Sequence, residues 1–291
     1  MEIIFHCDDM GATINSTKRI LQACEDGLIN SFSILANGEG IEDISKRLKE
    51  LTNGKLRIAI HLNLLEGKLL SSINKSLLAD NYGNMHFSFI DLLFYWLLCS
   101  KKKRKILLNE IEQEWRAQIE MVKTICYPHQ ITSVDGHEHI NILPFLFPLV
   151  VKLAEEQKIP QIRIPREVFH FSENLRESLS ITFLVNIIKH YVLKILTWYS
   201  IDKLKLHNDN RTKYIIGILY TGIITRSSVK AGIEAAEKKR ATSVEIIFHI
   251  GKAAETEMNR WEGNQKVASF NTSTDRDKEY NELVKLRREG L

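Results

Sequence analysis

Short runs rich in isoleucine, valine and phenylalanine alternate along the chain with longer segments of helical periodicity. The strand-like runs are Ile3–His6, Phe32–Ala36, Arg57–His61, Thr132–Asp135, Gln161–Ile164, Tyr214–Leu219 and Val244–Phe248. The helical segments include Thr17–Glu25, Ile41–Leu51, Leu107–Thr124, Leu146–Gln157 and Arg226–Lys239. A strand, a crossover helix and a second strand form the repeating unit of a parallel sheet. The alternation therefore predicts an α/β fold, a distorted (β/α) barrel similar to a TIM barrel.

The length and composition of the chain are typical of one large globular domain. With 291 residues, 44% of them hydrophobic, the chain can bury the core of a single barrel. The sequence contains no internal repeat and no low-complexity linker. We therefore expect one domain that spans residues 1–291.

Charge and cysteine usage narrow the class of protein. The 40 Lys and Arg residues nearly balance the 36 Asp and Glu residues, which argues against a nucleic-acid partner. The four cysteines form no Cys-x-x-Cys pair, a pattern typical of a reducing compartment. The first residues, Met1–Phe5, lack the basic and apolar regions of a signal peptide, so we expect a cytoplasmic location.

Polar residues gather where the predicted strands end. The first strand runs into Asp8 and Asp9, and the third ends at His61. The fourth is followed by Asp135-Gly136-His137-Glu138-His139, and the last by His249. Because the carboxyl ends of barrel strands share one rim, we expect these side chains to lie close together.

Carboxylate oxygen and imidazole nitrogen are the ligands that a divalent metal ion takes from such a set. Asp8 and Asp9 can reach a common site only if the strand bends out of its alternation near Gly11. Taken singly, each of these residues could have a purely structural role. An Asp pair can precede a helix, and His61 or His249 can be a hydrogen-bonded core residue. Their joint occurrence at four strand ends favours a functional site.

The ordered set of motifs resembles the YdjC-like carbohydrate deacetylases, the chito-oligosaccharide and hopanoid-associated group. The family's Asn-Ala-Asp-Asp-Phe-Gly, His-x-x-Leu-x-x-Gly and Asp-Ser/Gly-His-x-His-x-His runs are similar to residues 6–11, 61–67 and 135–141. Its later Gly-x-x-x-Thr-Gly and Cys-His-Pro-Gly runs are similar to residues 217–222 and 248–251. The resemblance covers residues 1–251 in order, and it implies the same barrel fold.

The resemblance also implies roles for individual residues. It assigns metal ligation to Asp9, His61 and His137, with Asp8 as the general base and His249 as the general acid or a group that orients one. Zinc is the first expectation from the histidine content, and Mg²⁺, Mn²⁺ and Co²⁺ stay open. The implied reaction is hydrolysis of the N-acetyl group of an amino sugar, with acetate released. His249 would then titrate near neutrality and give a bell-shaped pH profile.

Three positions depart from the family pattern. Asn141 stands where the last histidine of the His-x-His-x-His run is usual, and Ile250 replaces the proline after His249. His6 replaces the asparagine beside the Asp pair. None of the three removes an implied metal ligand, so we expect activity to survive, on a different sugar if the departures alter binding.

A sugar substrate needs hydrogen-bonding and aromatic groups around the site. We expect them from residues near strand ends, namely His139, Arg163, Arg166, Tyr220 and Thr221. For the two arginines, a solvated salt bridge is the alternative to substrate contact. The partner is then an N-acetylated sugar or oligosaccharide, and a homodimer is left open.

Two apolar segments, Phe87–Cys99 and Ile181–Tyr199, are expected to be helices with one apolar face packed on the barrel. The basic run Lys101–Lys105 follows the first of them, and a solvated loop is the expected structure. An apolar helix beside a polybasic run also suits contact with an anionic membrane. The sequence favours the packed helix over the membrane.

Two other functions stay open. The chain could be another metal-dependent amide or ester hydrolase, since the sequence does not specify the leaving group. It could also be a carbohydrate-binding relative that has lost activity, although the presence of both Asp residues and the three histidines argues against this.

Overall fold

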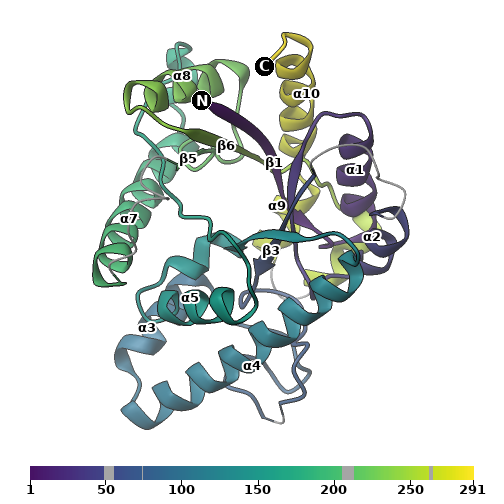
Figure 1. Cartoon of the computed structure of the whole chain (residues 1–291), viewed down its shortest axis with the longest axis vertical. Coiled ribbons are helices and arrows are strands. Elements are labelled where there is room, and N and C mark those ends of the chain that lie inside the picture. The colour runs from purple at the N-terminus through teal and green to yellow at the C-terminus, as the bar shows by residue number, and fades with distance from the viewer. Residues whose placement is uncertain (49–55, 74, 205–212, 262–264) are drawn as a thin grey trace.

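The structure is a computed structural model that describes residues 1–48, 56–73, 75–204, 213–261 and 265–291. A curled sheet of parallel strands lies at its centre, with helices around the outside (Figure 1). The strands are β1 (Glu2–Met10), β2 (Ser31–Ile34), β3 (Arg57–Leu62), β4 (Ile131–Gly136), β5 (Lys213–Ile216) and β6 (Ser243–Phe248). Their order in the sheet is β4-β3-β2-β1-β6-β5. The predicted distorted barrel is confirmed.

One irregular segment, residues 161–167, links the two edge strands of the sheet. The backbone N–H of Val134 in β4 donates to Gln161 O at 2.9 Å, and Ile162 forms a parallel bridge with Val134. On the other side, the N–H of Ile215 in β5 donates to Arg166 O at 2.8 Å. The segment thereby joins both edges and turns the curled sheet into a distorted barrel.

The predicted strand Gln161–Ile164 is therefore wrong as a regular strand. Only Ile162 forms a ladder pair there, because the segment changes partner from β4 to β5 within a few residues. Pro160 and Pro165 flank the bridge and lack the N–H groups that a longer ladder requires.

The helices that surround the sheet confirm most of the sequence pattern. They are α1 (Ile14–Glu25), α2 (Ile41–Leu48), α3 (Phe89–Leu98), α4 (Lys101–Cys126), α5 (Phe147–Glu156), α6 (Leu175–Ser178), α7 (Ile181–Leu204), α8 (Arg226–Lys238), α9 (Gln265–Thr272) and α10 (Asp275–Arg288), with 3-10 turns η1 (His137–Ile142) and η2 (Glu255–Trp261). Residues 49–51, the last of the helix predicted at 41–51, lie outside the described residues.

The basic run Lys101–Lys105 is not a loop, as expected, but the first turns of α4. Ser100 caps the helix by accepting the N–H of Lys103 at 3.3 Å. Lysine is a good helix former, so the cap is sufficient to start the helix within the basic run.

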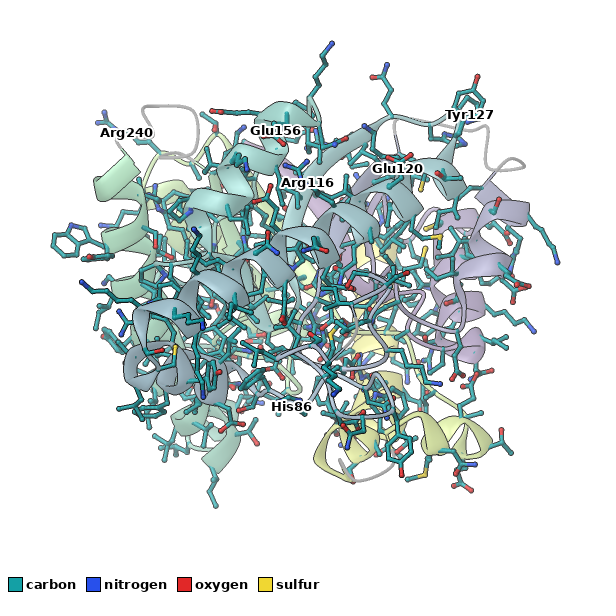
Figure 2. The ribbon with its side chains drawn as sticks, turned by 90° about the horizontal axis from the view of Figure 1, so that it is seen from below. His86, Arg116, Glu120, Tyr127, Glu156 and Arg240 are labelled. Atoms are coloured by element: carbon teal, nitrogen blue, oxygen red, sulfur yellow. The ribbon has the colours of Figure 1, made fainter. Side chains whose placement is uncertain are left out.

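Helix α4 crosses the outside of the barrel, and Arg116 ties it to α5 by an ion pair with Glu156 at 2.6 Å (Figure 2). Within α4, Arg116 also pairs with Glu112 at 2.6 Å. On its inner side the buried carboxylate of Glu114 accepts the backbone N–H groups of Leu70 and Ser71 at 3.0 and 2.9 Å. Glu114 thereby fixes the chain that follows β3 and leads away from the site.

We expect Glu114→Gln to lower the free energy of unfolding by about 1–3 kcal/mol, because the amide replaces one acceptor oxygen by an NH2 group that faces buried donors. Urea denaturation followed by circular dichroism measures the change. Glu120→Gln is the matched control, since Glu120 lies on the exposed side of the same helix (Figure 2). Equal effects of the two substitutions would contradict the role given to Glu114.

Candidate active site and metal centre

The carboxyl ends of the central strands bring the predicted polar residues together. In the β3–β4 register His61 pairs with Asp135, and in the β1–β6 register Cys7 pairs with Phe248. Asp8 and His249 are each the next residue along the chain. Residues from four strands therefore lie at one end of the barrel, as the sequence predicts.

The adjacent residues Asp8 and Asp9 both face this end because β1 is irregular there. The β1–β2 register shifts between Cys7 and Met10, and Asp9 has a φ of 65°. A bulge with a left-handed residue breaks the strand alternation, so neighbouring side chains no longer point to opposite faces. The expected bend is confirmed, and it begins at Asp9, before Gly11. A left-handed Asp is strained, as is common at functional sites.

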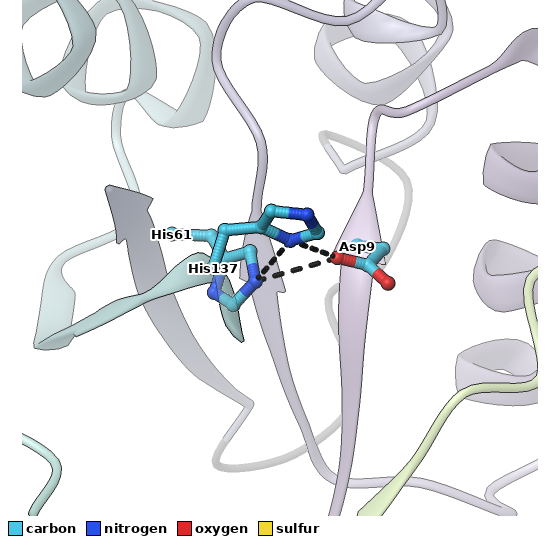
Figure 3. A group of neighbouring side chains, drawn as sticks. All are labelled: Asp9, His61 and His137. Atoms are coloured by element: carbon cyan, nitrogen blue, oxygen red, sulfur yellow. Dashed lines mark hydrogen bonds and ion pairs between the residues drawn. The ribbon is translucent and has the colours of Figure 1, made fainter. Parts of the chain in front are cut away.

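Asp9, His61 and His137 point toward one another (Figure 3). The Oδ1 atom of Asp9 lies 3.0 Å from Nδ1 of His137 and 3.3 Å from Nε2 of His61. The two imidazole nitrogens are 3.3 Å apart, and the three potential ligand atoms lie within 4.8 Å of one another. One carboxylate and two imidazoles in this arrangement leave room for water and substrate on a metal ion.

A carboxylate lies behind each of the two histidines, and the one behind His61 is close enough to fix the orientation of its ring. Nδ1 of His61 lies 2.6 Å from Oδ1 of Asp135, so Nε2 is directed at Asp9 and His137. Nε2 of His137 lies 3.9 Å from Oε1 of Glu66, whose other oxygen accepts the indole N–H of Trp261 at 2.7 Å. Histidines that ligate metals are oriented in this way in most proteins.

The acidic groups around His61 and His137 favour a positive charge at this cluster. Burial works to lower the pKa of His61, but the attraction of Asp135 and Asp8 outweighs it and raises the pKa to about 10. The pKa of His137 is also raised, because attraction to Asp9 exceeds the effect of burial. Two imidazole lone pairs can face each other across 3.3 Å only if a proton or a metal ion lies between them. The residues present therefore fit a divalent metal ion.

Asp8 is held by a dense set of donors. Arg163 forms a bidentate pair with it, Nη1 to Oδ1 at 2.8 Å and Nη2 to Oδ2 at 2.9 Å. Ser33 donates to Oδ1 at 2.9 Å, and Nε2 of His6 lies 2.9 Å from the same oxygen. Although burial opposes ionisation, Arg163 and His61 keep the pKa of Asp8 well below its usual range. Oδ2 keeps a lone pair that none of these contacts uses.

Arg163 is thus not at the substrate rim, where it was expected. Its guanidinium is buried and also lies 3.1 Å from Asp135 and 3.1 Å from Glu245. The bidentate fork suits paired carboxylates, which explains why an arginine beneath the site holds Asp8 in place.

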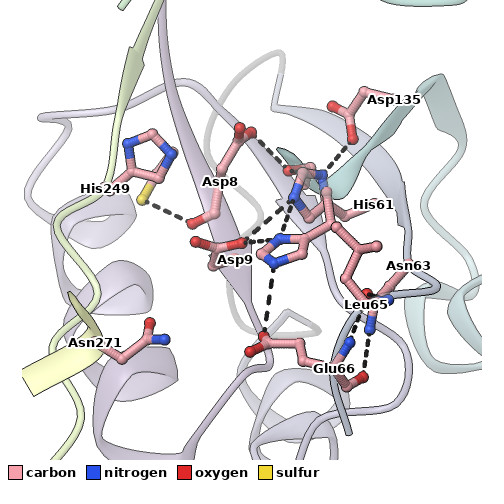
Figure 4. Close-up of polar contacts among 12 residues, drawn as sticks. Asp8, Asp9, His61, Asn63, Leu65, Glu66, Asp135, His249 and Asn271 are labelled. Atoms are coloured by element: carbon pink, nitrogen blue, oxygen red, sulfur yellow. Dashed lines mark hydrogen bonds and ion pairs between the residues drawn. The ribbon is translucent and has the colours of Figure 1, made fainter. Parts of the chain in front are cut away.

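His249 follows β6 and lies across Asp8 from His61 (Figure 4). Its backbone N–H donates to Oε2 of Glu279 at 2.7 Å, and its carbonyl accepts from Arg276 at 3.2 Å. Burial lowers the pKa of His249 to about 4, because the effect of burial is larger than the opposing attraction of Asp9. The imidazole is therefore neutral at pH 7, which differs from the near-neutral titration expected from the sequence.

Two other residues expected to contact the substrate, His139 and Tyr220, are both buried. His139 is buried, and burial with the nearby cations Lys189 and Arg163 keeps its pKa well below the usual range. Tyr220 is fully buried, and its hydroxyl accepts the N–H of Ser172 at 2.6 Å, so it is a core residue.

The two further candidates, Thr221 and Arg166, are held by other contacts. The Thr221 hydroxyl donates within its own turn, to Ile218 O at 3.1 Å and to Gly217 O. Arg166 stacks over Tyr214, with 6.0 Å from the guanidinium carbon to the ring centroid. Tyr214 lies in the first half of β5, toward the opposite end of the barrel, so the structure does not bring Arg166 to the site.

The three residues that depart from the family pattern, His6, Asn141 and Ile250, are all buried. His6 lies 3.0 Å from Glu245, in addition to its contact with Asp8. Asn141 is buried and donates to Arg163 O at 3.2 Å, which fastens η1 to the segment beneath Asp8. Ile250 is fully buried.

Sequence reasoning missed several residues that shape the site, which are Ser33, Glu66, Glu245, Arg276 and Glu279. Glu66 lies inside the motif that follows His61, and Glu245 sits in a strand of otherwise apolar residues, so each had a local signal. Arg276, 4.0 Å from Oδ2 of Asp9, comes from α10, beyond the residues 1–251 that carry the motifs. No strand-end pattern marks it.

A cavity of about 420 Å³ lies at the amino ends of the strands, lined by Ser31, Arg57, Thr132 and Ser243 among others. It is at the opposite end of the barrel from the ligand cluster. Strand ends and ligand geometry, rather than this cavity, locate the active site.

The pair of Glu245 and His6 predicts a pH dependence of stability. His6 and Arg163 outweigh burial and lower the pKa of Glu245 from 4.5 to about 2. Glu245 therefore contributes stability above pH 4.5 that is lost as the pH falls toward 2. Against the effect of burial, Glu245 and Asp8 raise the pKa of His6 from 6.5 to about 9, so its contribution is lost as the pH rises from 6.5 through 9.

We expect Glu245→Gln to reduce both the loss of stability toward pH 2 and the loss of stability above pH 6.5. Urea unfolding at a series of pH values measures these two changes. Glu234→Gln, at an exposed position of α8, is the control and should leave both limbs as they are. Unchanged slopes in Glu245→Gln would mean that this pair does not govern the profile.

Comparison with known proteins identifies relatives of this chain in sequence and in fold. The family model described as "YdjC-like protein" matches residues 2–286. The crystal structure of a protein from Enterococcus faecalis V583, named as a candidate cellobiose-phosphate cleavage protein, superposes with a TM-score of 0.60 over 97% of this chain and 94% of that one. At 18% sequence identity, this likeness shows the shared fold alone.

Curated relatives share more sequence. A carbohydrate deacetylase of Brevibacillus brevis is 28% identical over 85% of this chain and 91% of its own. One of Clostridium beijerinckii is 30% identical over 55% of this chain, and a chitooligosaccharide deacetylase of Proteus mirabilis 29% over 56%. The matched segment spans only 59% of the length of each of the latter two. Because the family model matches residues 2–286, nearly the whole of this chain, the chain belongs to the YdjC-like protein family.

Proposed function

We propose that this protein is a divalent-metal-dependent hydrolase that removes the acetyl group from the nitrogen of an acetylated amino sugar. The observation that carries the proposal is the convergence of Asp9, His61 and His137 within 4.8 Å, beside the ionised carboxylate of Asp8. Relatives named carbohydrate deacetylase and chitooligosaccharide deacetylase support an N-acetylated sugar or oligosaccharide as the substrate.

Asp9, His61 and His137 would hold the ion. When bound, a divalent ion supplies Lewis acidity, which polarises an acetyl oxygen and makes a water molecule more acidic. The two imidazoles make zinc our first choice, with Mg²⁺, Mn²⁺ and Co²⁺ as further candidates. The hydrogen bond to Asp135 keeps the ring of His61 directed at the ion, and Glu66 faces Nε2 of His137 from 3.9 Å.

Asp8 is our candidate for the general base. Arg163, Ser33 and His6 occupy Oδ1 and one position of Oδ2, so one lone pair of Oδ2 is left to accept a proton from water. The pairing with Arg163 lowers the basicity of Asp8, and the reaction therefore relies on a water molecule that is already acidified.

His249 is our candidate for the group on the leaving-amine side. Since its pKa is about 4, the free protein does not carry a proton on both ring nitrogens at neutral pH. The neutral ring can donate one hydrogen bond and orient the departing nitrogen. It protonates that nitrogen only if the bound substrate raises its pKa.

Two alternatives have distinct consequences. A metal-dependent amide or ester hydrolase of another specificity would cleave other acyl groups and leave N-acetyl sugars intact. An inactive carbohydrate-binding relative would bind sugars without releasing acetate. The ionised Asp8 beside the metal ligands favours an active enzyme, because a binding protein gains nothing from a buried base.

We expect the protein to release acetate from N-acetylated chito-oligosaccharides, and a chelator to abolish the release until a divalent ion is restored. Asp9→Ala, His61→Ala and His137→Ala should each remain folded and lose bound metal, since two ligands hold an ion much less tightly than three. Elemental analysis and an acetate assay measure the two results. Undiminished metal in all three variants would contradict the ligand assignment.

We expect Asp8→Asn to retain metal but to lower kcat by about 10²–10⁴-fold, because an amide cannot accept a proton from water. Ser33→Ala is the control, since it removes one hydrogen bond to Asp8 and leaves the carboxylate in place. It should retain most of the turnover. Near-normal turnover in Asp8→Asn would assign the base elsewhere, with the neutral His139 tested next.

A further inference from the structure

Helix α7 exposes a large apolar face, although it lies on the surface of the barrel. The described side chains that it exposes are almost all apolar or aromatic, namely Ile181, Leu184, Val185, Ile188, Tyr191, Val192, Ile195, Trp198 and Tyr199, together with Thr182 and Lys194. Its buried side carries the apolar Phe183 and Leu193 and also the polar residues Asn186, His190, Thr197 and Ser200. A surface helix that packs only on its own protein places polar residues outward.

The buried polar groups hold α7 to the barrel. Asn186 donates to the carbonyls of Leu219 at 3.2 Å and Thr221 at 3.0 Å, and Ser200 donates to Ile142 O at 3.0 Å. Residues 181–201 are long and apolar enough to cross a membrane, but these bonds fix one face of the helix on the protein. The exposed face is therefore suited to lie along an interface.

Helix α3 extends this apolar surface. Ile90, Phe94, Leu97 and Leu98 are each more than half exposed. Phe89, at the start of α3, packs on the same small core cluster as Leu193, Leu196 and Ile201 of α7. Figure 1 shows the two helices following one another along one side of the molecule. Each helix packs one apolar side on the barrel, as expected, with Leu92 of α3 and Phe183 and Leu193 of α7 buried, but each also exposes further apolar residues.

The basic run at the start of α4 directly follows α3. Lys101, Lys102, Lys103 and Lys105 are exposed, and none forms an ion pair with a described acidic side chain. Positive charges at a helix N-terminus are opposed by the helix dipole, and no acidic residue in the first turn offsets them. Arg104 is used by the fold, since it donates to Leu97 O at 2.9 Å and stacks over Trp96, whereas the four lysines are available to an external anionic partner.

We propose that the outer face of α7, the exposed residues of α3 and the run Lys101–Lys105 form a surface that docks on an anionic phospholipid membrane. The apolar side chains would enter the boundary between headgroups and acyl chains, while the lysines contact the phosphates. Trp198 and Tyr199 are of the types that favour this boundary. A second copy of the chain is a poorer occupant, because a symmetric contact would bring two lysine runs near each other. The proposal does not depend on the proposed enzymatic function.

The test is co-sedimentation of the full-length protein with vesicles of phosphatidylcholine alone or mixed with phosphatidylglycerol. We expect binding to the mixed vesicles that weakens as salt rises from about 0.05 to 0.5 M, because screening shortens the reach of the lysines. Equal binding to neutral vesicles, or no binding at low salt, would overturn the proposal.

Two charge variants with equal loss of charge sharpen the test. Lys101→Gln, Lys102→Gln and Lys103→Gln together should weaken binding on the order of 100-fold, at the usual contribution of a basic residue near anionic lipid. The control combines Lys238→Gln, Lys239→Gln and Arg240→Gln, an exposed run at the end of α8. Arg240 lies far from His86, which precedes α3, and α8 and α3 lie at opposite ends of the molecule (Figures 1 and 2). The control should bind as the unchanged protein does, and an equal loss in both would overturn the proposed surface.

Leu98→Ser with Ile188→Ser tests the apolar part, with Met121→Ser on the outside of α4 as the control. The double variant should lose vesicle binding and keep its thermal melting temperature, since both side chains are exposed. Analytical ultracentrifugation without lipid completes the test. If the unchanged protein self-associates, the double variant is monomeric and neither binds vesicles, the surface is a contact between copies and the proposal fails.

Discussion

The structure depends on the balance of charge that the barrel buries at the carboxyl ends of its strands. Asp8 and Asp9 of β1 and Asp135 of β4 are buried, and Glu245 of β6 is mostly buried beside them. Buried carboxylates are stable only with cations or multiple donors beside them. Arg163 lies within about 3 Å of three of the four, so it fixes their relative positions. Asp9, the fourth, is turned away by the bulge in β1 and faces the two histidines instead.

Most of the fold could be predicted because its signals are local. Six of the seven strand-like runs form the sheet, since each is an apolar run bounded by residues that end a strand. Residues 161–164 could not be assigned correctly, because their partner changes from β4 to β5 and only the three-dimensional arrangement sets this. The helical state of Lys101–Lys105 followed from the cap at Ser100, a signal that the charge pattern concealed.

The candidate site was predictable where chemistry and position coincide. Asp9, His61 and His137 are ligand types at strand ends, which parallel topology brings to one end of the barrel, and the bulge in β1 turns Asp9 toward the two histidines. The environment of each group was not predictable, because it depends on contacts far along the chain. Burial gives His249 a pKa of about 4, and Arg163 contacts Asp8 over 155 positions of sequence. A strand-end arginine looks the same in sequence whether it faces solvent or a buried carboxylate.

The position of α7 joins the site to the apolar surface. Its inner face holds the carbonyls of Leu219 and Thr221, which follow β5, and of Ile142 at the end of η1, the turn that carries His137. These bonds are directed inward, so a partner that covers the outer face does not compete for them. In water, the outer face leaves large apolar side chains such as Ile188 and Trp198 hydrated, at a cost of about 25 cal/mol for each Å² of apolar surface. The inner bonds keep α7 in place despite that cost, so the helix can present an apolar face to a partner without loosening the turn that positions a metal ligand.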